Sequence, residues 1–242
     1  MAFQAKSDAI SSDVVGYQGN ALRSGNKAMG ASFAAVTGST IDLNDLTVTG
    51  YDKADGCEGD VSLQILDAAG MGGMTYFWYD IVDGSDVLYG WFDGNDEPVE
   101  DGVVTFAAGE GLWVNAPSGD YNLQSAGKVP TTGISVILRS GNKLAVNNTP
   151  VTIDLNDVSV SGYNTEDGCE GDVNLQILDA TGMGGMTYFW YDIEDGSDVL
   201  FGWYDGNDEP VEDSTVLVGA GEGLWVNAPS SAYSIVFPGV TL

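Results

Sequence analysis

Clustered carboxylates are the side chains of this chain best placed to do chemistry. They lie in "GWFDGNDEPVED" (90–101), which recurs with one change as "GWYDGNDEPVED" (202–213). Neighbouring carboxylates repel one another, and a hard cation bound by oxygen ligands relieves that repulsion. We therefore predict a possible Ca²⁺ site in each loop, with these candidate ligands: Asp93, Asn95, Asp96, Glu97, Asp205, Asn207, Asp208 and Glu209. The alternative is a solvated turn, because Asp-Gly and Asn-Asp favour turn geometry.

The rest of the composition removes most catalytic chemistry. The chain has no histidine, so it lacks the usual general base and the commonest transition-metal ligand. A glycosidase would need two carboxyl groups across a cleft, and no pair is singled out by an apolar setting. We predict that the protein is not an enzyme. The formal charge of −29 argues against nucleic acid and anionic membranes as partners, and no apolar run is long enough for a membrane helix.

Tryptophans are the candidates for binding sugar or another partner. In a strand, "YFWYD" puts Tyr76 and Trp78 on one face and Phe77 and Tyr79 on the other. Only one face can belong to the core, so the other could meet a module, a partner or a sugar ring. The candidate binding residues are Trp78, Trp91, Trp190 and Trp203, and a carbohydrate platform could be lined by Trp91 and Trp113, with Trp203 and Trp225. The alternative is packing in the core, where large aromatic side chains are common.

Four of the seven basic residues lie in the repeated turn "RSGNK". They are Arg23, Lys27, Arg139 and Lys143. On so acidic a protein they form a positive spot on each module, which could dock on the acidic loops of a neighbour and give head-to-tail contacts. The alternative is a weak local salt bridge. With modules arranged head to tail, we expect Cys57 and Cys169 to be buried free thiols.

These residues belong to two copies of one module. Residues 55–101 and 167–213 match at 42 of 47 positions, and "GEGLWVNAPS" occurs at 109–118 and 221–230. Short β-branched or aromatic runs alternate with period two, separated by Gly, Asp and Asn clusters. We predict an all-β fold of two tandem antiparallel β-sandwiches, Ig-like or jelly-roll-like. The expected boundaries are 1–15 for an N-terminal extension, 16–128 and 129–242.

The order of motifs within each copy resembles a known family. A strand leads into an "SGNK" turn, a "GWxDG" hairpin follows, and "GEGLWVNAPS" precedes a last strand. This pattern resembles the repeated β-sandwich modules of bacterial secreted and cell-surface proteins that have a G-x-G-x-W-V closing strand. "SSDVVGYQ" (11–18) is similar to the start of the mature part of such proteins. The resemblance implies an extracellular or cell-surface location and no catalytic residues, although no signal peptide is visible in this chain.

We therefore expect a non-enzymatic, extracellular structural or interaction protein that assembles with itself into a surface layer or filament. Residues 1–13 have no counterpart in the second copy, and we expect them to pair with a neighbouring molecule by strand addition. One alternative function is a tandem carbohydrate-binding or adhesion module that binds a surface glycan. Another is a salt-adapted acidic protein, since a high Asp and Glu content favours solubility in brine.

Overall fold

The structure is a computed structural model that describes residues 15–35, 40–66, 73–83, 86–178, 185–195 and 198–241. In this part of the chain the regular structure is β-strand apart from two 3₁₀ turns, η1 (Leu43–Asp45) and η2 (Leu155–Asp157). All pairs of named strands are antiparallel. The predicted all-β sandwich fold is confirmed. No helix in the described residues is long and apolar enough to cross a membrane.

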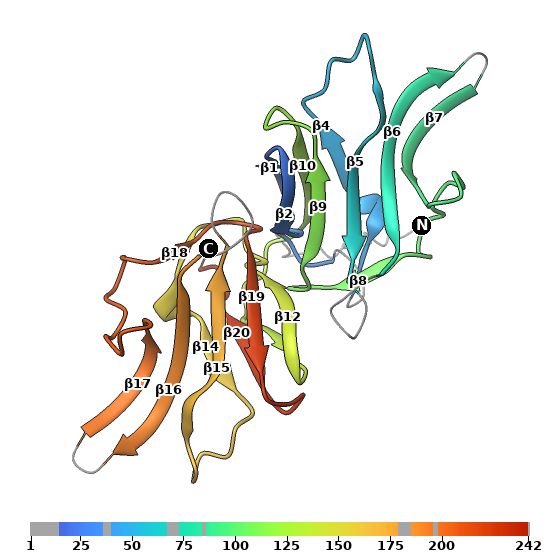
Figure 1. Ribbon diagram of the computed structural model, residues 1–242. Helices are drawn as coiled ribbons and strands as arrows, with labels where there is room; N and C mark the ends of the chain where they lie inside the picture. The colour runs from blue at the N-terminus through green and yellow to red at the C-terminus, as the bar shows by residue number, and fades with distance from the viewer. Residues whose placement is uncertain are drawn as a thin grey trace, which may run out of the picture.

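The first module packs a five-stranded sheet against a three-stranded sheet (Figure 1). In sheet order, the five strands are β2 (Gly25–Met29), β9 (Leu112–Ala116), β5 (Cys57–Ile65), β6 (Thr75–Asp83) and β7 (Asp86–Phe92). The three are β1 (Val15–Ala21), β10 (Asn122–Lys128) and β4 (Leu46–Thr49). A small ribbon joins β3 (Thr40–Asp42) to β8 (Thr105–Ala107).

The second module repeats this topology strand for strand. Its five-stranded sheet consists of β12 (Gly141–Val146), β19 (Gly223–Ala228), β15 (Cys169–Ile177), β16 (Thr187–Asp195) and β17 (Asp198–Tyr204). Its three-stranded sheet consists of β11 (Ile134–Ile137), β20 (Ser234–Phe237) and β14 (Ser159–Ser161). Its small ribbon consists of β13 (Ile153–Asp154) and β18 (Leu217–Val218). The predicted boundary at residues 128 and 129 falls between β10 and β11.

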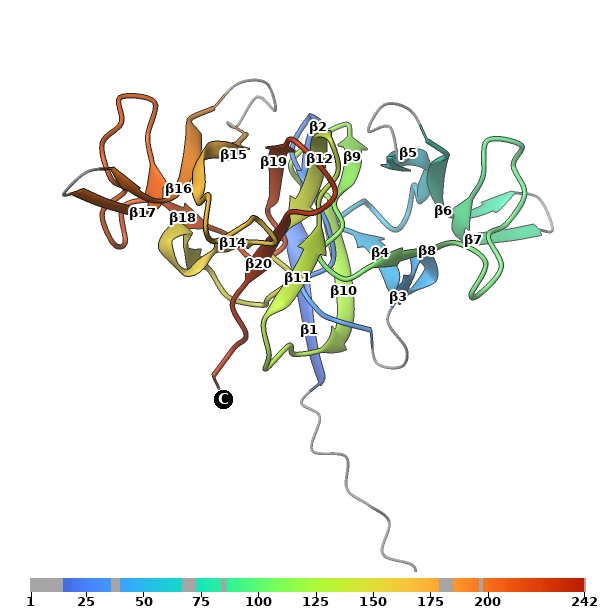
Figure 2. The same ribbon diagram turned by 90° about the horizontal axis from the view of Figure 1, so that it is seen from below.

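Period-two alternation places one face of each five-stranded sheet in a core. Tyr76 and Trp78 of β6 are buried, whereas Phe77 and Tyr79 on the opposite face are half-buried. Each module has its own hydrophobic cluster between its two sheets, and the clusters share no residue. The outward faces of both five-stranded sheets lie on the same side of the molecule, with the three-stranded sheets behind them (Figure 2).

The two modules meet about a local two-fold axis. A backbone bridge pairs Met29 with Glu222, and a second bridge pairs Ala145 with Glu110. Ala145 occupies the position of Met29 in the other copy, and Glu110 that of Glu222, so the same contact is made twice with the roles exchanged. That is an isologous interface. The expectation of a head-to-tail arrangement of the modules is therefore wrong, because the contact surfaces are equivalent rather than different.

Glycines of the "GEG" motif allow this close approach. A Cβ atom on Gly111 would lie 2.3 Å from Cγ of Leu144 in the other module. By the same geometry, a Cβ on Gly223 would lie 2.8 Å from Cβ of Ala28. Both separations are far shorter than van der Waals contact, so no larger residue fits without moving the modules apart. The repeated G-x-G of the closing strand thus has a structural role at the junction.

Candidate functional site

The acidic loops are turns held by their own carboxylates. Oδ1 of Asp93 accepts hydrogen bonds from the backbone N–H groups of Asn95 (2.8 Å) and Glu97 (3.0 Å). Asp205 makes the same bonds with Asn207 (2.8 Å) and Glu209 (3.0 Å). Asp96 and Asp208 take positive φ angles of 60°, a left-handed conformation that Asp tolerates in tight turns. Thus one carboxylate oxygen in each loop is used by the backbone.

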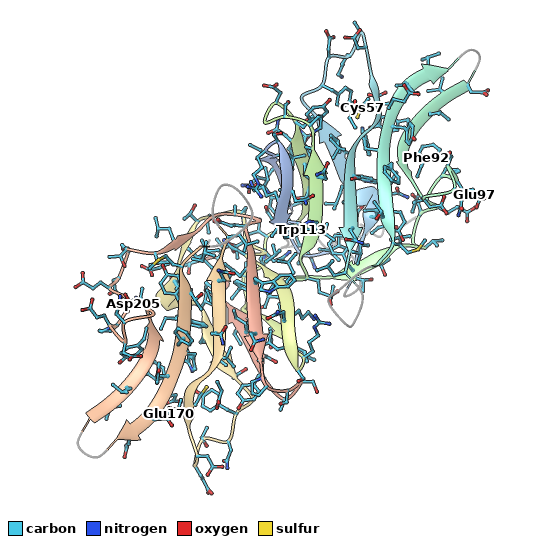
Figure 3. All side chains as sticks on the ribbon, viewed as in Figure 1. Cys57, Phe92, Glu97, Trp113, Glu170 and Asp205 are labelled. Atoms are coloured by element: carbon cyan, nitrogen blue, oxygen red, sulfur yellow. The ribbon has the colours of Figure 1, made fainter. Side chains whose placement is uncertain are left out.

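Among the described residues, no group of three or more Asp, Glu, Cys or His side chains is arranged to hold a metal ion. Figure 3 labels one acidic residue of each loop, Glu97 and Asp205. Calcium binding at these loops stays a prediction from the sequence. The turn geometry itself is accounted for by hydrogen bonds within the loop.

The hydrogen bonds predict how the loops respond to acid. Donation from the N–H groups of Glu97 and Asn95 lowers the pKa of Asp93 below its ordinary value, and the same geometry lowers the pKa of Asp205. A carboxyl group whose pKa is lower in the folded state stabilises the loop above its unfolded pKa and loses that effect as the pH falls through the folded pKa. NMR titration of the two side-chain carboxyl carbons should therefore give pKa values below 3.8. Values above that would contradict the turn geometry.

The tryptophans proposed as a sugar platform are in the cores. Trp78, Trp91, Trp190 and Trp203 are at most 3% exposed. Trp78 and Trp91 pack edge to face with ring centroids 5.3 Å apart, and Nε1 of Trp91 donates to the carbonyl of Leu46 at 2.8 Å. A binding platform on these four residues is therefore wrong, since a ligand cannot reach them. Period-two alternation fixed which residues share a face, but it did not tell which face is buried.

The basic turns lie at the module junction. Nζ of Lys143 is 3.1 Å from Oε1 of Glu110 in the other module, and it also donates to the carbonyl of Ile137. Lys27, its counterpart, donates to the carbonyl of Ala21. Burial lowers the pKa of Lys27, and the nearby carboxylate of Glu222 opposes that shift. The acidic partners therefore belong to "GEG" rather than to the loops at 93–97 and 205–209, which corrects the expected docking.

Each arginine bonds to the backbone of its own turn. Arg23 donates to the backbone carbonyl of Asn26, and Arg139 to that of Asn142. Each bond closes the "RSGNK" turn on itself and orients the strand that follows. Salt bridges as exposed as that of Lys143 and Glu110 contribute little to stability, so the close backbone contacts carry the junction.

The thiols of Cys57 and Cys169 are buried and free. Burial raises the pKa of both thiols, which keeps them protonated and unreactive in the folded state. Figure 3 labels Cys57 at the start of β5, away from the junction. The expectation of free buried thiols is confirmed, although the head-to-tail arrangement with which it was linked is wrong.

A groove lies beside the β6–β7 hairpin of the first module, and another lies beside the equivalent β16–β17 hairpin of the second. Both are at the end of the module away from the junction (Figure 1). The first has a volume of about 400 Å³ and is lined in part by Lys53, Ala54 and Val82. The second has a volume of about 700 Å³, and the equivalent residues are Thr165, Glu166 and Glu194. These three differences make the second groove more negative by three unit charges. The sequence signal was available, because Val82 and Glu194 differ within a segment that is otherwise nearly identical.

Large apolar side chains are exposed on the same hairpins. Val82, Val87 and Tyr89 are between 63% and 72% exposed, and so are Val199 and Phe201 in the second module. Val87 and Tyr89 belong to β7, which is the edge strand of its sheet, and β17 is the corresponding edge. Sequence reasoning did not single out these residues as a candidate surface, because a strand's position within its sheet is not visible in its own pattern.

The N-terminal segment 1–13, expected to pair with a neighbouring molecule, lies outside the described residues. Comparisons of the chain with protein-family models, with curated proteins and with solved structures returned no match.

Proposed function

We propose that this protein is a structural subunit that associates end to end through the edge strands β7 and β17, forming a filament or layer. The observation that carries the proposal is an open sheet edge with exposed apolar residues at each end of the molecule. An unpaired edge presents free N–H and C=O groups to another strand. Soluble monomers usually protect such edges with charges, prolines or covering loops.

Each edge is covered along only part of its length. The loop that follows β7 folds back on its C-terminal end, where the N–H of Val99 donates to the carbonyl of Trp91 at 2.8 Å. Val211 makes the same bond to Trp203 at 2.9 Å. The outer parts of both strands, with Val87 and Tyr89 or Val199 and Phe201, lie beyond this cover. These parts have the β-branched and aromatic residues that pair well across strands.

The two edges lie at opposite ends of the molecule (Figure 1). Because each subunit then has two separate contact sites, association can continue from one subunit to the next. The grooves favour pairing of β7 with β17. If β17 of one molecule paired with β17 of another, Glu166 and Glu194 would face the same carboxylates of the other copy. If β17 pairs with β7, the first groove offers Lys53 to those carboxylates. The resemblance to cell-surface proteins supports the cell exterior as the place of assembly.

Charged substitutions on the edges test the proposal. We expect the wild-type protein to form long particles at high concentration and physiological or higher ionic strength, where the repulsion from a charge of −29 is screened. Val87→Lys and Val199→Lys should each prevent growth if β7 pairs only with β17. Light scattering and negative-stain electron microscopy measure particle mass and shape.

Val15→Lys is the matched control, because Val15 is 60% exposed and belongs to β1 of the three-stranded sheet, not to β7 or β17. It should assemble as the wild-type protein does. Dimers formed by either single edge variant would show pairing between like edges and contradict the polarity. A wild-type protein that stays monomeric in all these salts would overturn the proposal itself.

A further inference from the structure

The outward faces of the two five-stranded sheets share an unusual surface. Strand register aligns their side chains in two adjoining rows across the sheet. In the first module the rows are Asn26–Asn115–Ser62–Phe77–Phe92 and Ala28–Trp113–Gln64–Thr75. In the second they are Asn142–Asn227–Asn174–Phe189–Tyr204 and Leu144–Trp225–Gln176–Thr187. We call this surface the neutral face.

No residue of the neutral face is charged, although 18% of the chain is. The face holds amides, hydroxyls, apolar side chains and aromatic rings, of which Ala28, Leu144 and Phe92 are buried. Charged residues surround it instead: Asp96 accepts from the Tyr79 hydroxyl at 3.5 Å beyond the row of Phe77. A surface from which carboxylates are absent, on a protein with a charge of −29, is suited to a ligand that carries no charge.

Trp113 and Trp225 bring aromatic surface to the centre of this face. Both are half-buried, unlike the four core tryptophans, and each pairs in register with a residue at the junction, Ala28 or Leu144. Figure 3 labels Trp113 close to the point where the modules meet. Strands β9 and β19, which contain Trp113 and Trp225, lie on either side of the junction, and the outward faces of their sheets lie on the same side of the molecule (Figure 2).

Paired amides lie beside each ring. Nδ2 of Asn115 donates to Oδ1 of Asn26 at 2.9 Å, and Asn227 and Asn142 form the equivalent pair at 2.9 Å. The bond holds each side chain in one orientation. Because an amide has two N–H donors and an acceptor oxygen, each pair keeps donor and acceptor capacity for a ligand. Neutral amides also cost less to desolvate than carboxylates would.

We propose that the neutral face binds an uncharged polysaccharide, with sugar rings stacked on Trp113 and Trp225 and hydroxyl groups bonded to the flanking amides. Sugar rings have apolar C–H faces that pack on indole and a rim of hydroxyls that bond to amides. Adjacent strands are about 4.8 Å apart, so a row across five strands spans roughly 20 Å, the length of several sugar units. Anionic glycans are disfavoured by the overall negative charge and by the absence of basic residues from the face.

The two-fold axis gives the site two equivalent halves on one surface. A single long chain can contact both, and its second contact is then intramolecular, which raises the overall affinity without new kinds of contact. The site reaches β7 and β17 only at Phe92 and Tyr204, at the ends covered by the loop that follows each strand, whereas the proposed assembly uses the outer parts of these strands. It therefore goes beyond the proposed assembly, and either can fail without the other.

Affinity gel electrophoresis of the full chain tests the proposal. The gels contain soluble neutral polysaccharides (hydroxyethylcellulose, mixed-linkage β-glucan, xyloglucan, glucomannan or arabinoxylan) or the anionic control polygalacturonate. We expect retardation by at least one neutral polymer and none by polygalacturonate. The variant with both Trp113→Ala and Trp225→Ala should bind about tenfold or more weakly, and each single variant should retain part of the binding.

Tyr17→Ala is the matched control, since Tyr17 is an exposed aromatic residue on the three-stranded sheet. It should bind as the wild-type protein does. Circular dichroism of each variant checks folding, and Asn115→Ala with Asn227→Ala provides a second test that leaves the rings in place. The edge variant Val87→Lys should bind normally, which separates this site from assembly. Retardation by none of the neutral polymers, or retardation unaffected by both pairs of substitutions, would overturn the proposal.

Discussion

Replacing Asn148 by alanine should lower the free energy of unfolding by about 2–4 kcal/mol, because two buried carbonyl groups lose their donor. Nδ2 of Asn148 donates to the carbonyl of Ala31 at 2.7 Å and to that of Phe33 at 2.9 Å. Asn148 belongs to the second module and both acceptors to the first. The side chain is 1% exposed, so water cannot replace it without opening the junction. Equilibrium denaturation in urea measures the change.

The surrounding contacts explain why this loss should act on the junction. The N–H of Asn147 donates to the carbonyl of Glu222 at 3.0 Å, and the N–H of Gly221 to the carbonyl of Asn147 at 2.9 Å. These bonds bring the loop of Asn148 beside the "GEG" segment. In the first module Ser32 stands where Asn148 stands in the second. The two bonds of Asn148 therefore occur on one side of the two-fold axis only, because the equivalent position on the other side is a serine.

Two further variants sharpen the test. Asn207→Ala removes an exposed amide and should change the stability by no more than about 0.5 kcal/mol. Asn148→Asp keeps the shape but places a carboxylate against two carbonyl oxygens, so we expect a larger loss than with alanine. The N–H groups of Gly30 and Val146 donate across the junction to the carbonyls of Gly221 and Gly109. Faster hydrogen exchange of these two amides in Asn148→Ala would locate the effect at the junction. An unchanged urea midpoint would show that the junction does not depend on this residue.

Much of the fold could be predicted because its signals are local. Alternation along "YFWYD" separates Tyr76 and Trp78 from Phe77 and Tyr79, and the turn residues mark the strand ends. The all-β fold followed from these patterns. The internal repeat also predicted that the same strand order would occur twice, since a copied sequence with the same alternation buries the same face.

The junction could not be predicted in the same way. Its contacts join Met29 with Glu222 and Ala145 with Glu110. The sequence around these residues does not indicate which distant residues they contact. The glycines of "GEG" were visible, but a glycine is required equally by a turn, a bulge or a close approach. Only the position of Leu144 beside Gly111 shows that close approach is the reason here. The two-fold geometry is thus a property of surfaces assembled from distant segments.

The candidate site shows the same limit. The sequence predicted that Trp91 and Trp113 could line one platform and did not separate the buried ring from the exposed one. Whether an outward residue meets solvent depends on which face the second sheet of the sandwich covers. That sheet comes from β1, β4 and β10, which are distant in sequence from β9. The edge position of β7 likewise depends on the order of all five strands, so nothing in the local sequence identifies Val87 and Tyr89 as edge residues.

Trp91→Ala should be among the most damaging single substitutions, with a loss of about 3–5 kcal/mol in the free energy of unfolding. Trp91 is 1% exposed and packs against Trp78 in the first core. Alanine would leave a cavity there and would also leave the carbonyl of Leu46 without the Nε1 donor at 2.8 Å. Trp203→Ala should behave alike, because Trp203 is 1% exposed and bonds to Val158 in the same way.

Trp113→Ala should lose much less of the free energy of unfolding than Trp91→Ala. Trp91 and Trp113 are the same residue type on opposite faces of one five-stranded sheet, with Trp91 in the core and Trp113 on the neutral face. Removal of a partly exposed ring forfeits only part of the transfer free energy, so we expect a loss of no more than about 2 kcal/mol. Urea denaturation of the two variants measures the difference, and the slope of the unfolding free energy against urea concentration should be the same for both. Equal losses at both positions would contradict the assignment of faces, and with it the argument that Trp113 is free to meet a ligand.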